Sequence, residues 1–370
     1  MIGDSVGAVG RDKLPGRRPV LGVTLLCLGA MLLGLAIACS ESFLPAWAVT
    51  DLRAVAALVE VDGEPGRARP SPEDDIEVSI LVVDRGAPPS DFPEVPALTP
   101  SLLQWVFLAC VPEPTLIGPP ICRDLIEPCD GCIGTPPPNP LDFPVVSFQV
   151  PSQAELEAAE ADQVLVQGAI CADGPPAQDA ILRFIRGETD DLNPCEDPSN
   201  EGRFVTVSIP IETTPEDPNL HPAISTVLLN GRPWPPPYDQ EVPRTAPRTG
   251  CLADLTDEQR AAQPTAGSPA STINLHVTPE SLQPYMVGDM ALTEEIQVSW
   301  LTDGGDLERS FSFITDPERS VLTQWLPFAE APEDGRLVRF NFVIRDGRGG
   351  TDWVERGLCL LPAPADQSPP

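Results

Sequence analysis

Apolar and polar residues alternate over many short stretches between residues 51 and 360. In residues 76–83 every second side chain is apolar, which is the period of a strand with one buried face. Residues 102–110 are apolar on both faces and predict a central strand. The same reasoning predicts further strands at residues 145–150, 164–171, 180–186, 204–211, 224–229, 273–277, 296–300, 338–344 and 351–360.

Turn and cap signals separate these strands. Asn230-Gly231 is the strongest two-residue signal for a β-hairpin, and the glycine-rich sequence from Asp346 to Gly350 predicts a second hairpin. The sequence also predicts two capping boxes, each at the start of a short helix. One is formed by Ser152 and Glu155, and the other by Thr256 and Gln259. Many short strands and few helices predict a mainly β protein with antiparallel sheets, most simply packed as sandwiches.

Proline-rich segments divide the chain into expected domains. Residues 111–144 hold ten prolines and predict an extended, polyproline-like excursion, and residues 232–270 form a second proline-rich insertion. Residues 213–222 have the composition of a linker. The expected parts are an N-terminal β-sandwich domain at 51–212, the linker at 213–222, a C-terminal domain at 223–363 and a disordered tail at 364–370.

The first 39 residues carry an export signal. A basic segment is followed by Val20 to Ala38, an uncharged apolar run that would form a helix and is long enough to span a bilayer. Its end, from Leu35 to Cys39, resembles the lipobox of bacterial lipoproteins, although Ala36 stands where those proteins usually have leucine. The resemblance implies a signal peptide at 1–38, lipidation of Cys39 and a tether at 39–50. An uncleaved transmembrane anchor and simple secretion are the alternatives.

Charge excludes several classes of function. The chain has 55 acidic and 23 basic residues, a formal net charge of -32, which disfavours binding to nucleic acid or to anionic lipid. Lys13 is the only lysine and lies in the signal segment, so the mature protein would have none. Schiff-base chemistry, a P-loop and a Ser-Lys dyad are therefore excluded.

Eight cysteines remain beyond the signal and the lipidation candidate, and an even number in an exported protein predicts disulfides. They are Cys110, Cys122, Cys129, Cys132, Cys171, Cys195, Cys251 and Cys359. Spacing favours the pairs Cys251–Cys359 and Cys171–Cys195, whereas the first four cysteines allow three pairings. The Cys-x-x-Cys spacing at Cys129 also leaves open a zinc site or a thioredoxin-like redox role, both of which the surrounding sequence disfavours.

Residues 296–361 resemble the second half of a bacterial immunoglobulin-like or PKD/cadherin-like domain. The resemblance lies in Trp300, the Thr302-Asp-Gly-Gly305 turn and Trp325. Its most specific part is the hairpin whose turn is contained in Val-Ile-Arg-Asp-Gly-Arg-Gly-Gly350. Residues 52–110 resemble the first strands of such a domain more weakly. The family implies two antiparallel sandwiches and hosts adhesion, scaffolding and partner binding. Because Cys251 lies 49 residues before Trp300, the disulfide between sheets found in antibodies is not implied.

Candidate catalytic chemistry is sparse. The two histidines are His221, in the linker, and His276, which the alternation places toward solvent. Acid clusters that could bind calcium or only make turns are Asp303/Asp306/Glu308 and Asp346/Asp352. Tryptophans that could line a glycan surface or fill the core are Trp105, Trp300, Trp325 and Trp353, with Trp353 expected to pack on Trp300 or Trp325.

These observations assign no catalytic residue, metal or cofactor. The expected protein is a non-catalytic, lipid-anchored component of the cell envelope of a Gram-negative bacterium, with a membrane partner through its anchor and a protein or glycan partner for its loops. The alternatives are a secreted hydrolase that uses paired carboxylates, which needs neither lysine nor histidine, and a single-pass membrane-anchored adhesion protein.

Overall fold

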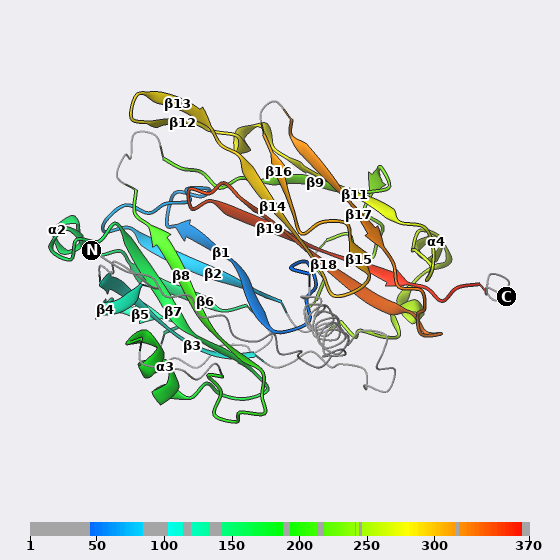
Figure 1. Cartoon of the computed structure of the whole chain (residues 1–370), viewed down its shortest axis with the longest axis horizontal. Helices are drawn as coiled ribbons and strands as arrows, with labels where there is room; N and C mark the ends of the chain where they lie inside the picture. The colour runs from blue at the N-terminus through cyan, green and yellow to red at the C-terminus, as the bar shows by residue number, and fades with distance from the viewer. Residues whose placement is uncertain are drawn as a thin grey trace, which may run out of the picture. The chain divides into compact units, whose positions relative to one another are not determined.

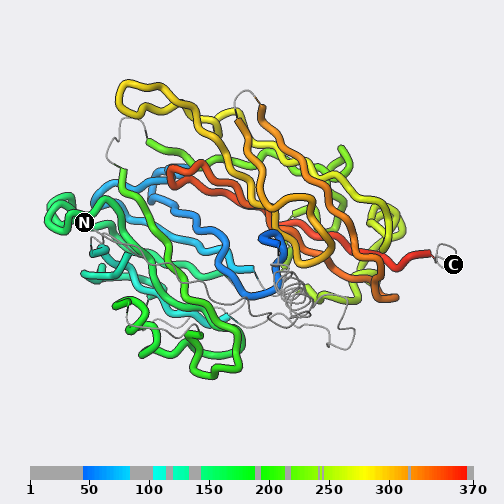
Figure 2. Tube along the Cα trace, in the orientation of Figure 1, coloured from blue at the N-terminus to red at the C-terminus, as the bar shows by residue number. Residues whose placement is uncertain are grey.

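The computed structural model describes residues 45–83, 103–113, 120–132, 143–187, 193–212, 218–240, 242–243, 246–315 and 318–364. The signal segment, Cys39 and most of the C-terminal tail therefore lie outside the described residues. Residues from Pro45 onward belong to one compact unit. This unit holds two β-sandwiches, drawn in blue to green and, from β9 onward, in green to red in Figure 1 and Figure 2. Within the described residues, no helix is long and apolar enough to cross a membrane.

The first sandwich has two four-stranded antiparallel sheets. One sheet has the order β1 (Arg53–Val61), β2 (Asp75–Val83), β6 (Val145–Gln149) and β5 (Cys129–Asp130). The other has the order β4 (Ile121–Leu125), β3 (Leu103–Glu113), β7 (Gln163–Ala172) and β8 (Gly202–Pro210). Their facing apolar side chains form one core, in which the predicted face of β2 is almost fully buried.

The second sandwich repeats this arrangement. One sheet has the order β10 (Arg232–Pro233), β9 (Ile224–Leu229), β11 (Ser271–Val277), β17 (Ser320–Leu326) and β15 (Asp306–Leu307). The other has the order β16 (Phe311–Ile314), β14 (Ile296–Thr302), β18 (Arg336–Arg345) and β19 (Thr351–Leu360). The hairpin of β12 (Pro284–Val287) and β13 (Met290–Thr293) pairs with no other described strand.

The first sandwich has the strand order of an immunoglobulin-like sandwich, in which strands A, B, E and D face strands C′, C, F and G. The second sandwich has the same order within its sheets, but β15, in the place of D, precedes β16, in the place of C′, along the chain. Each sandwich also places a tryptophan in the core from its C strand, Trp105 on β3 and Trp300 on β14. Trp300 is fully buried, contacts the edge of Phe342 and donates its indole N–H to Ser312 at 2.9 Å. The predicted mainly β class and antiparallel immunoglobulin-like sandwiches are therefore confirmed.

Several local predictions are also confirmed. Asn230 and Gly231 both have positive φ and join β9 to β10, as an Asn-Gly hairpin requires. Both capping boxes are present, at the start of α2 (Gln153–Ala158) and of α4 (Asp257–Ala261). Short 3₁₀ turns follow Gly250, at Cys251–Asp254, and Thr278, at Pro279–Ser281.

The strand predicted at residues 180–186 is wrong. Residues Gln178–Ile185 form the helix α3 instead, which packs Ile181 and Ile185 against the outer face of β3 and β7. The buried positions 180, 181 and 185 recur with helical spacing, and Asp179 faces Arg183 one turn later at 3.7 Å. A run this short carries too few residues to separate the two periods.

The segment predicted as a linker is packed where the structure describes it. Asn219 is fully buried, and its carbonyl accepts a hydrogen bond from the N–H of Ala68 at 2.8 Å. The N–H of His221 donates to the carbonyl of Gly66 at 2.7 Å. Residues of the predicted tether also pair with a strand, because the N–H of Val49 donates to the carbonyl of Thr302 at 2.9 Å.

Candidate functional site

The turn between β18 and β19 is organised by the carboxylate of Asp346, which is 6% exposed. Its Oδ1 accepts from the backbone N–H groups of Arg348, at 2.7 Å, and Gly350, at 2.9 Å. Its Oδ2 accepts from the side-chain amide of Asn219 at 2.7 Å. Gly347 and Gly349 supply the positive φ angles that the turn needs. Asp346 therefore makes a turn with its own backbone and also holds a segment 127 residues away.

This turn lies against the first sandwich. A Cβ on Gly349 would be 3.2 Å from Cγ of Pro210, at the end of β8, and 3.4 Å from Cγ of Arg69. Gly349 also has a φ of +117°, which side chains rarely adopt. Both conditions restrict this position to glycine, and the close approach of Pro210 and Arg69 comes from the other sandwich.

His221 bridges the two sandwiches through both ring nitrogens. Nδ1 accepts from the backbone N–H of Thr351 at 3.0 Å, so this nitrogen carries no proton. Nε2 lies 2.7 Å from the carbonyl oxygen of Val59 on β1 and must be the donor. These two hydrogen bonds tie β19 to β1.

Arg345 makes a further link, because its guanidinium donates to the carbonyl of Val55 on β1 and to Oγ of Ser299. Burial lowers the pKa of Arg345 from its usual value. Around these polar contacts lies an apolar cluster with members from both sandwiches, namely Val49, Leu81, Val83, Leu301 and Val343. We call the Asp346 turn, His221, Arg345 and this cluster the junction.

The junction also fixes the base of the β12–β13 hairpin. Glu294 follows β13, its side chain is 1% exposed, and its Oε1 accepts from Nη1 of Arg348 at 2.8 Å. The same guanidinium lies over the ring of Tyr285 on β12, 4.5 Å from its centroid. Burial and, next, the charge of Asp346 raise the pKa of Glu294 to about 7, against the favourable charge of Arg348.

The raised pKa of Glu294 predicts a pH-dependent stability. The folded pKa of about 7 exceeds the ordinary 4.5, so the stabilisation is complete below pH 4.5 and is lost as the pH rises through 7. We expect Glu294 to lower the free energy of unfolding by about 1–3 kcal/mol between pH 5 and pH 8. Urea unfolding across this range should show a shallower decline for Glu294→Gln than for wild type. The control is the exposed neighbour in Glu295→Gln, and equal slopes in all three proteins would contradict the assignment.

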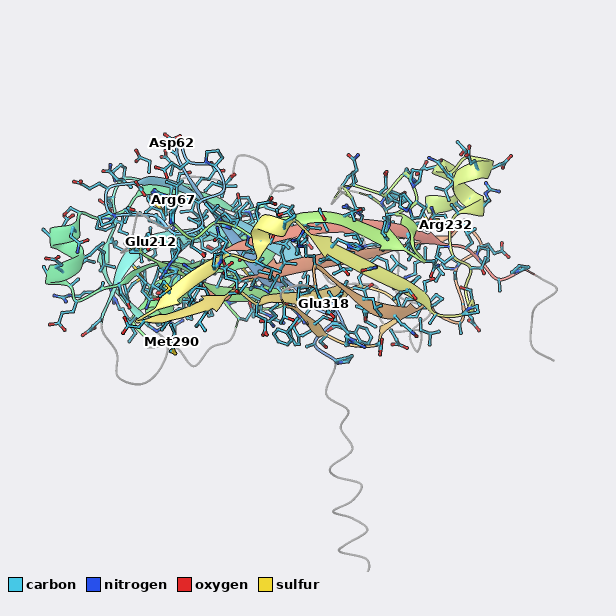
Figure 3. The ribbon with its side chains drawn as sticks, turned by 90° about the horizontal axis from the view of Figure 1, so that it is seen from above. Asp62, Arg67, Glu212, Arg232, Met290 and Glu318 are labelled. Atoms are coloured by element: carbon cyan, nitrogen blue, oxygen red, sulfur yellow. A yellow bond between two sulfur atoms is a disulfide. The ribbon has the colours of Figure 1, made fainter. Side chains whose placement is uncertain are left out.

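The far end of the hairpin is apolar and exposed. Met286, Val287, Met290 and Leu292 are 60%, 48%, 62% and 40% exposed. Two of the four methionines of the chain lie here, and Figure 3 labels Met290 near the hairpin tip. Since the hairpin connects strands B and C, it occupies the position of a binding loop in immunoglobulin variable domains.

The eight cysteines form four disulfides. The pairs are Cys110–Cys122, Cys129–Cys132, Cys171–Cys195 and Cys251–Cys359. The last two are the pairs that spacing favours. The first two are one of the three pairings that the sequence left open for the cysteines at 110–132. With the four cysteines of the cluster bonded to one another, their sulfurs are not thiolate ligands for zinc.

The acid clusters make internal contacts. Asp303 forms an ion pair with Arg248 and accepts from the N–H of Arg339 at 2.7 Å. Asp352 accepts from the N–H of Ile224 at 2.8 Å, and burial raises its pKa. Among the described residues, no group of three or more histidine, cysteine or acidic side chains is placed to hold a metal ion.

The candidate tryptophans and His276 lie in different environments. Trp105, Trp300 and Trp325 are in the two cores, whereas Trp353 contacts the junction cluster. The expectation that Trp353 packs on Trp300 or Trp325 is therefore wrong: Trp353 pairs with Val343, which faces out of the sandwich. His276 is half-buried rather than solvent-facing, and its Nε2 is shielded from water.

Sequence reasoning missed Asn219, Glu294 and Arg348 as parts of one network. Their partners lie between 54 and 127 residues away in the chain, so no periodic pattern marks them. The available signal was the Asp346 turn, whose glycines and acid indicated a specific backbone geometry.

The fold and junction define a protein with tandem immunoglobulin-like sandwiches. Comparison with solved structures finds a likeness to the "D0-D1 domain of Intimin", at 10% identity and a TM-score of 0.19, covering 81% of this chain and 99% of that chain. No family model and no curated protein matches the sequence. At this TM-score the likeness adds no argument, and the fold assignment rests on the strand order.

Proposed function

We propose that this is a non-catalytic protein of the cell envelope, anchored by a lipid on Cys39, that binds a protein or glycan partner through its loops. The observation that carries the binding role is the β12–β13 hairpin, an exposed apolar arm held at its base by Glu294, Arg348 and Tyr285. Water-exposed apolar side chains gathered on one element mark interaction sites. The two sandwiches would act as a rigid platform for this arm.

The anchor is inferred from the sequence from Val20 to Cys39. Lipid-modified cysteine with two or more acyl chains holds a protein stably on a membrane. The envelope of a Gram-negative bacterium fits an exported, acidic chain with four disulfides, because oxidising compartments maintain such bonds.

The hydrolase alternative needs two facing carboxylates that a substrate can reach. The described acids with a marked mutual influence are Glu294 and Asp346, and both are buried, at 3% and 6% exposure. Their hydrogen bonds to Arg348, Asn219 and the turn backbone account for them as a structural pair. This pair therefore gives the hydrolase no support.

Replacing the lipidation candidate tests the proposed anchor. Cys39→Ala should move the protein from the membrane fraction to the soluble envelope fraction, since the acyl acceptor is lost. Fractionation and intact-mass measurement of wild type, Cys39→Ala and the control Cys27→Ala check this. Cys27 lies inside the apolar run, and its replacement should leave an acylated mature protein that begins at Cys39. A Cys39→Ala protein that stays uncleaved in the membrane would identify Val20 to Ala38 as a transmembrane anchor.

A further inference from the structure

A second apolar feature lies on the C-terminal sandwich, between the edges of its two sheets. A cavity of about 550 Å³ lies between β16 and β17 and opens to solvent. Its apolar lining includes Phe311, Phe313 and Leu322, which are 46%, 54% and 49% exposed. Arg309 and Glu318 also line it, so its charged groups are of both signs. We call this feature the groove.

Strand edges border the groove. β16 pairs with β14 alone among the described strands, so its other edge has no ladder. On β17, the short strand β15 pairs only with Trp325 and Leu326, which leaves the edge of Ser320 to Thr323 without a described strand partner. Unpaired edges beside exposed aromatic side chains are templates for adding a strand.

The β12–β13 hairpin has the complementary properties. Each of its strands has one edge without a partner among the described strands, and its tip presents Met286, Val287 and Met290. Methionine packs well in irregular apolar spaces and contacts aromatic rings favourably through its sulfur. Asp289 at the tip could pair with Arg309, whose present partner is the equally exposed Glu308.

We propose that the groove of one molecule binds the β12–β13 hairpin of a second copy of the same protein. This inference rests on the binding role proposed for the hairpin and names its partner. The two surfaces differ and lie on different elements of one sandwich, so the contact is heterologous and can repeat from copy to copy. Neighbouring molecules anchored on the same membrane would meet at high local concentration, which strengthens a small contact.

The salt dependence of self-association distinguishes an apolar contact from an electrostatic one. A net charge of -32 makes two copies repel each other at low ionic strength. Salt screens this repulsion over about 8–10 Å and does not weaken apolar packing. Self-association through the hairpin and groove should therefore increase when salt is raised, whereas association driven by ion pairs would decrease.

The test uses full-length protein in a nonionic detergent, as tagged and untagged copies mixed in equal amounts. The arm variant is Met286→Asp with Met290→Asp, and the groove variant is Phe311→Asp with Phe313→Asp. The control is Leu182→Asp, which changes a leucine on α3 that is 42% exposed and lies outside both surfaces. Thermal unfolding of each variant verifies that these surface changes leave the fold intact.

Five mixtures give distinct results. Tagged wild type should capture untagged wild type, and control copies should capture each other equally. Arm variant with arm variant, or groove variant with groove variant, should lose capture by about tenfold or more, because each buried charge costs at least 1.4 kcal/mol. Arm variant mixed with groove variant should recover capture, since one copy keeps the groove and the other keeps the hairpin.

The recovery in the mixed pair is specific to a heterologous contact. Capture in no mixture, capture in all mixtures, or loss in the mixed pair would overturn the proposal. If the arm variant instead loses binding to neutral phosphatidylcholine vesicles while self-capture is unchanged, the hairpin binds lipid and the proposal is wrong. None of these outcomes depends on Cys39, so failure here is distinguishable from failure of the proposed anchor.

Discussion

A Cys251→Ala/Cys359→Ala variant is expected to lose about 4–5 kcal/mol of its free energy of unfolding. The two cysteines are 108 residues apart and both are fully buried. Their bond ties the proline-rich insertion to the last strand, and in the chain-entropy model a loop of this length strongly restricts the unfolded chain. Urea unfolding under non-oxidising and non-reducing conditions measures the loss.

The matched control is Cys129→Ala/Cys132→Ala. This disulfide closes a loop with a sequence separation of only 3, so its removal should cost about 2 kcal/mol or less. Both variants remove two sulfurs and one bond, and the sequence separations that they release are 108 and 3. Equal losses in the two variants would contradict the entropic account.

An Asp346→Ala variant is expected to lose about 3–5 kcal/mol. The substitution leaves the buried amide of Asn219 and the backbone N–H groups of Arg348 and Gly350 without their acceptor. It also removes the charge that helps to raise the pKa of Glu294, so that pKa should fall. Chemical unfolding and titration of Glu294 by NMR measure the two effects.

Asp306→Ala is the control for Asp346→Ala. Asp306 also lies near a glycine-rich turn of the second sandwich, but its side chain is exposed. Its replacement should change the free energy of unfolding by less than about 0.5 kcal/mol. Asp346→Asn keeps one carbonyl acceptor and should recover part of the loss. Similar values for Asp346→Ala and Asp306→Ala would show that the turn carries no special stability.

Strands and turns could be predicted from the sequence because each depends on neighbouring residues. Ile76, Val78 and Ile80 alternate with polar residues since one face of β2 packs into its own sandwich. Asn230-Gly231 specifies a hairpin because both residues tolerate the positive φ that the turn needs. Such signals need no knowledge of distant partners.

The predictions from the sequence fail where contacts between residues far apart in the chain determine the structure. Residues 180–186 are apolar enough for a strand, but the outer face of β3 and β7 accepts them as the helix α3. Trp353 lies outside the core because its strand pairing sets it opposite Val343, and the pairing register is invisible in the local pattern.

The junction was hidden for the same reason. His221 has the sequence context of a linker, yet its ring contacts Val59 and Thr351, which are 162 and 130 residues away. The glycine-rich turn was visible as a turn, but its packing on Pro210 was not. The division at residues 213–222 into two independent domains thus stays a prediction, and the contacts of residues 218–222 favour a joint unfolding unit.

Calorimetry tests most directly the central claim that the junction makes the two sandwiches one unit. Wild-type protein should unfold in a single transition whose calorimetric enthalpy equals its van't Hoff enthalpy. Asp346→Ala should split this transition in two, because it removes the acceptor that links the turn to Asn219. Two resolved transitions already in the wild-type protein, at temperatures that no substitution of a junction residue changes, would contradict the claim.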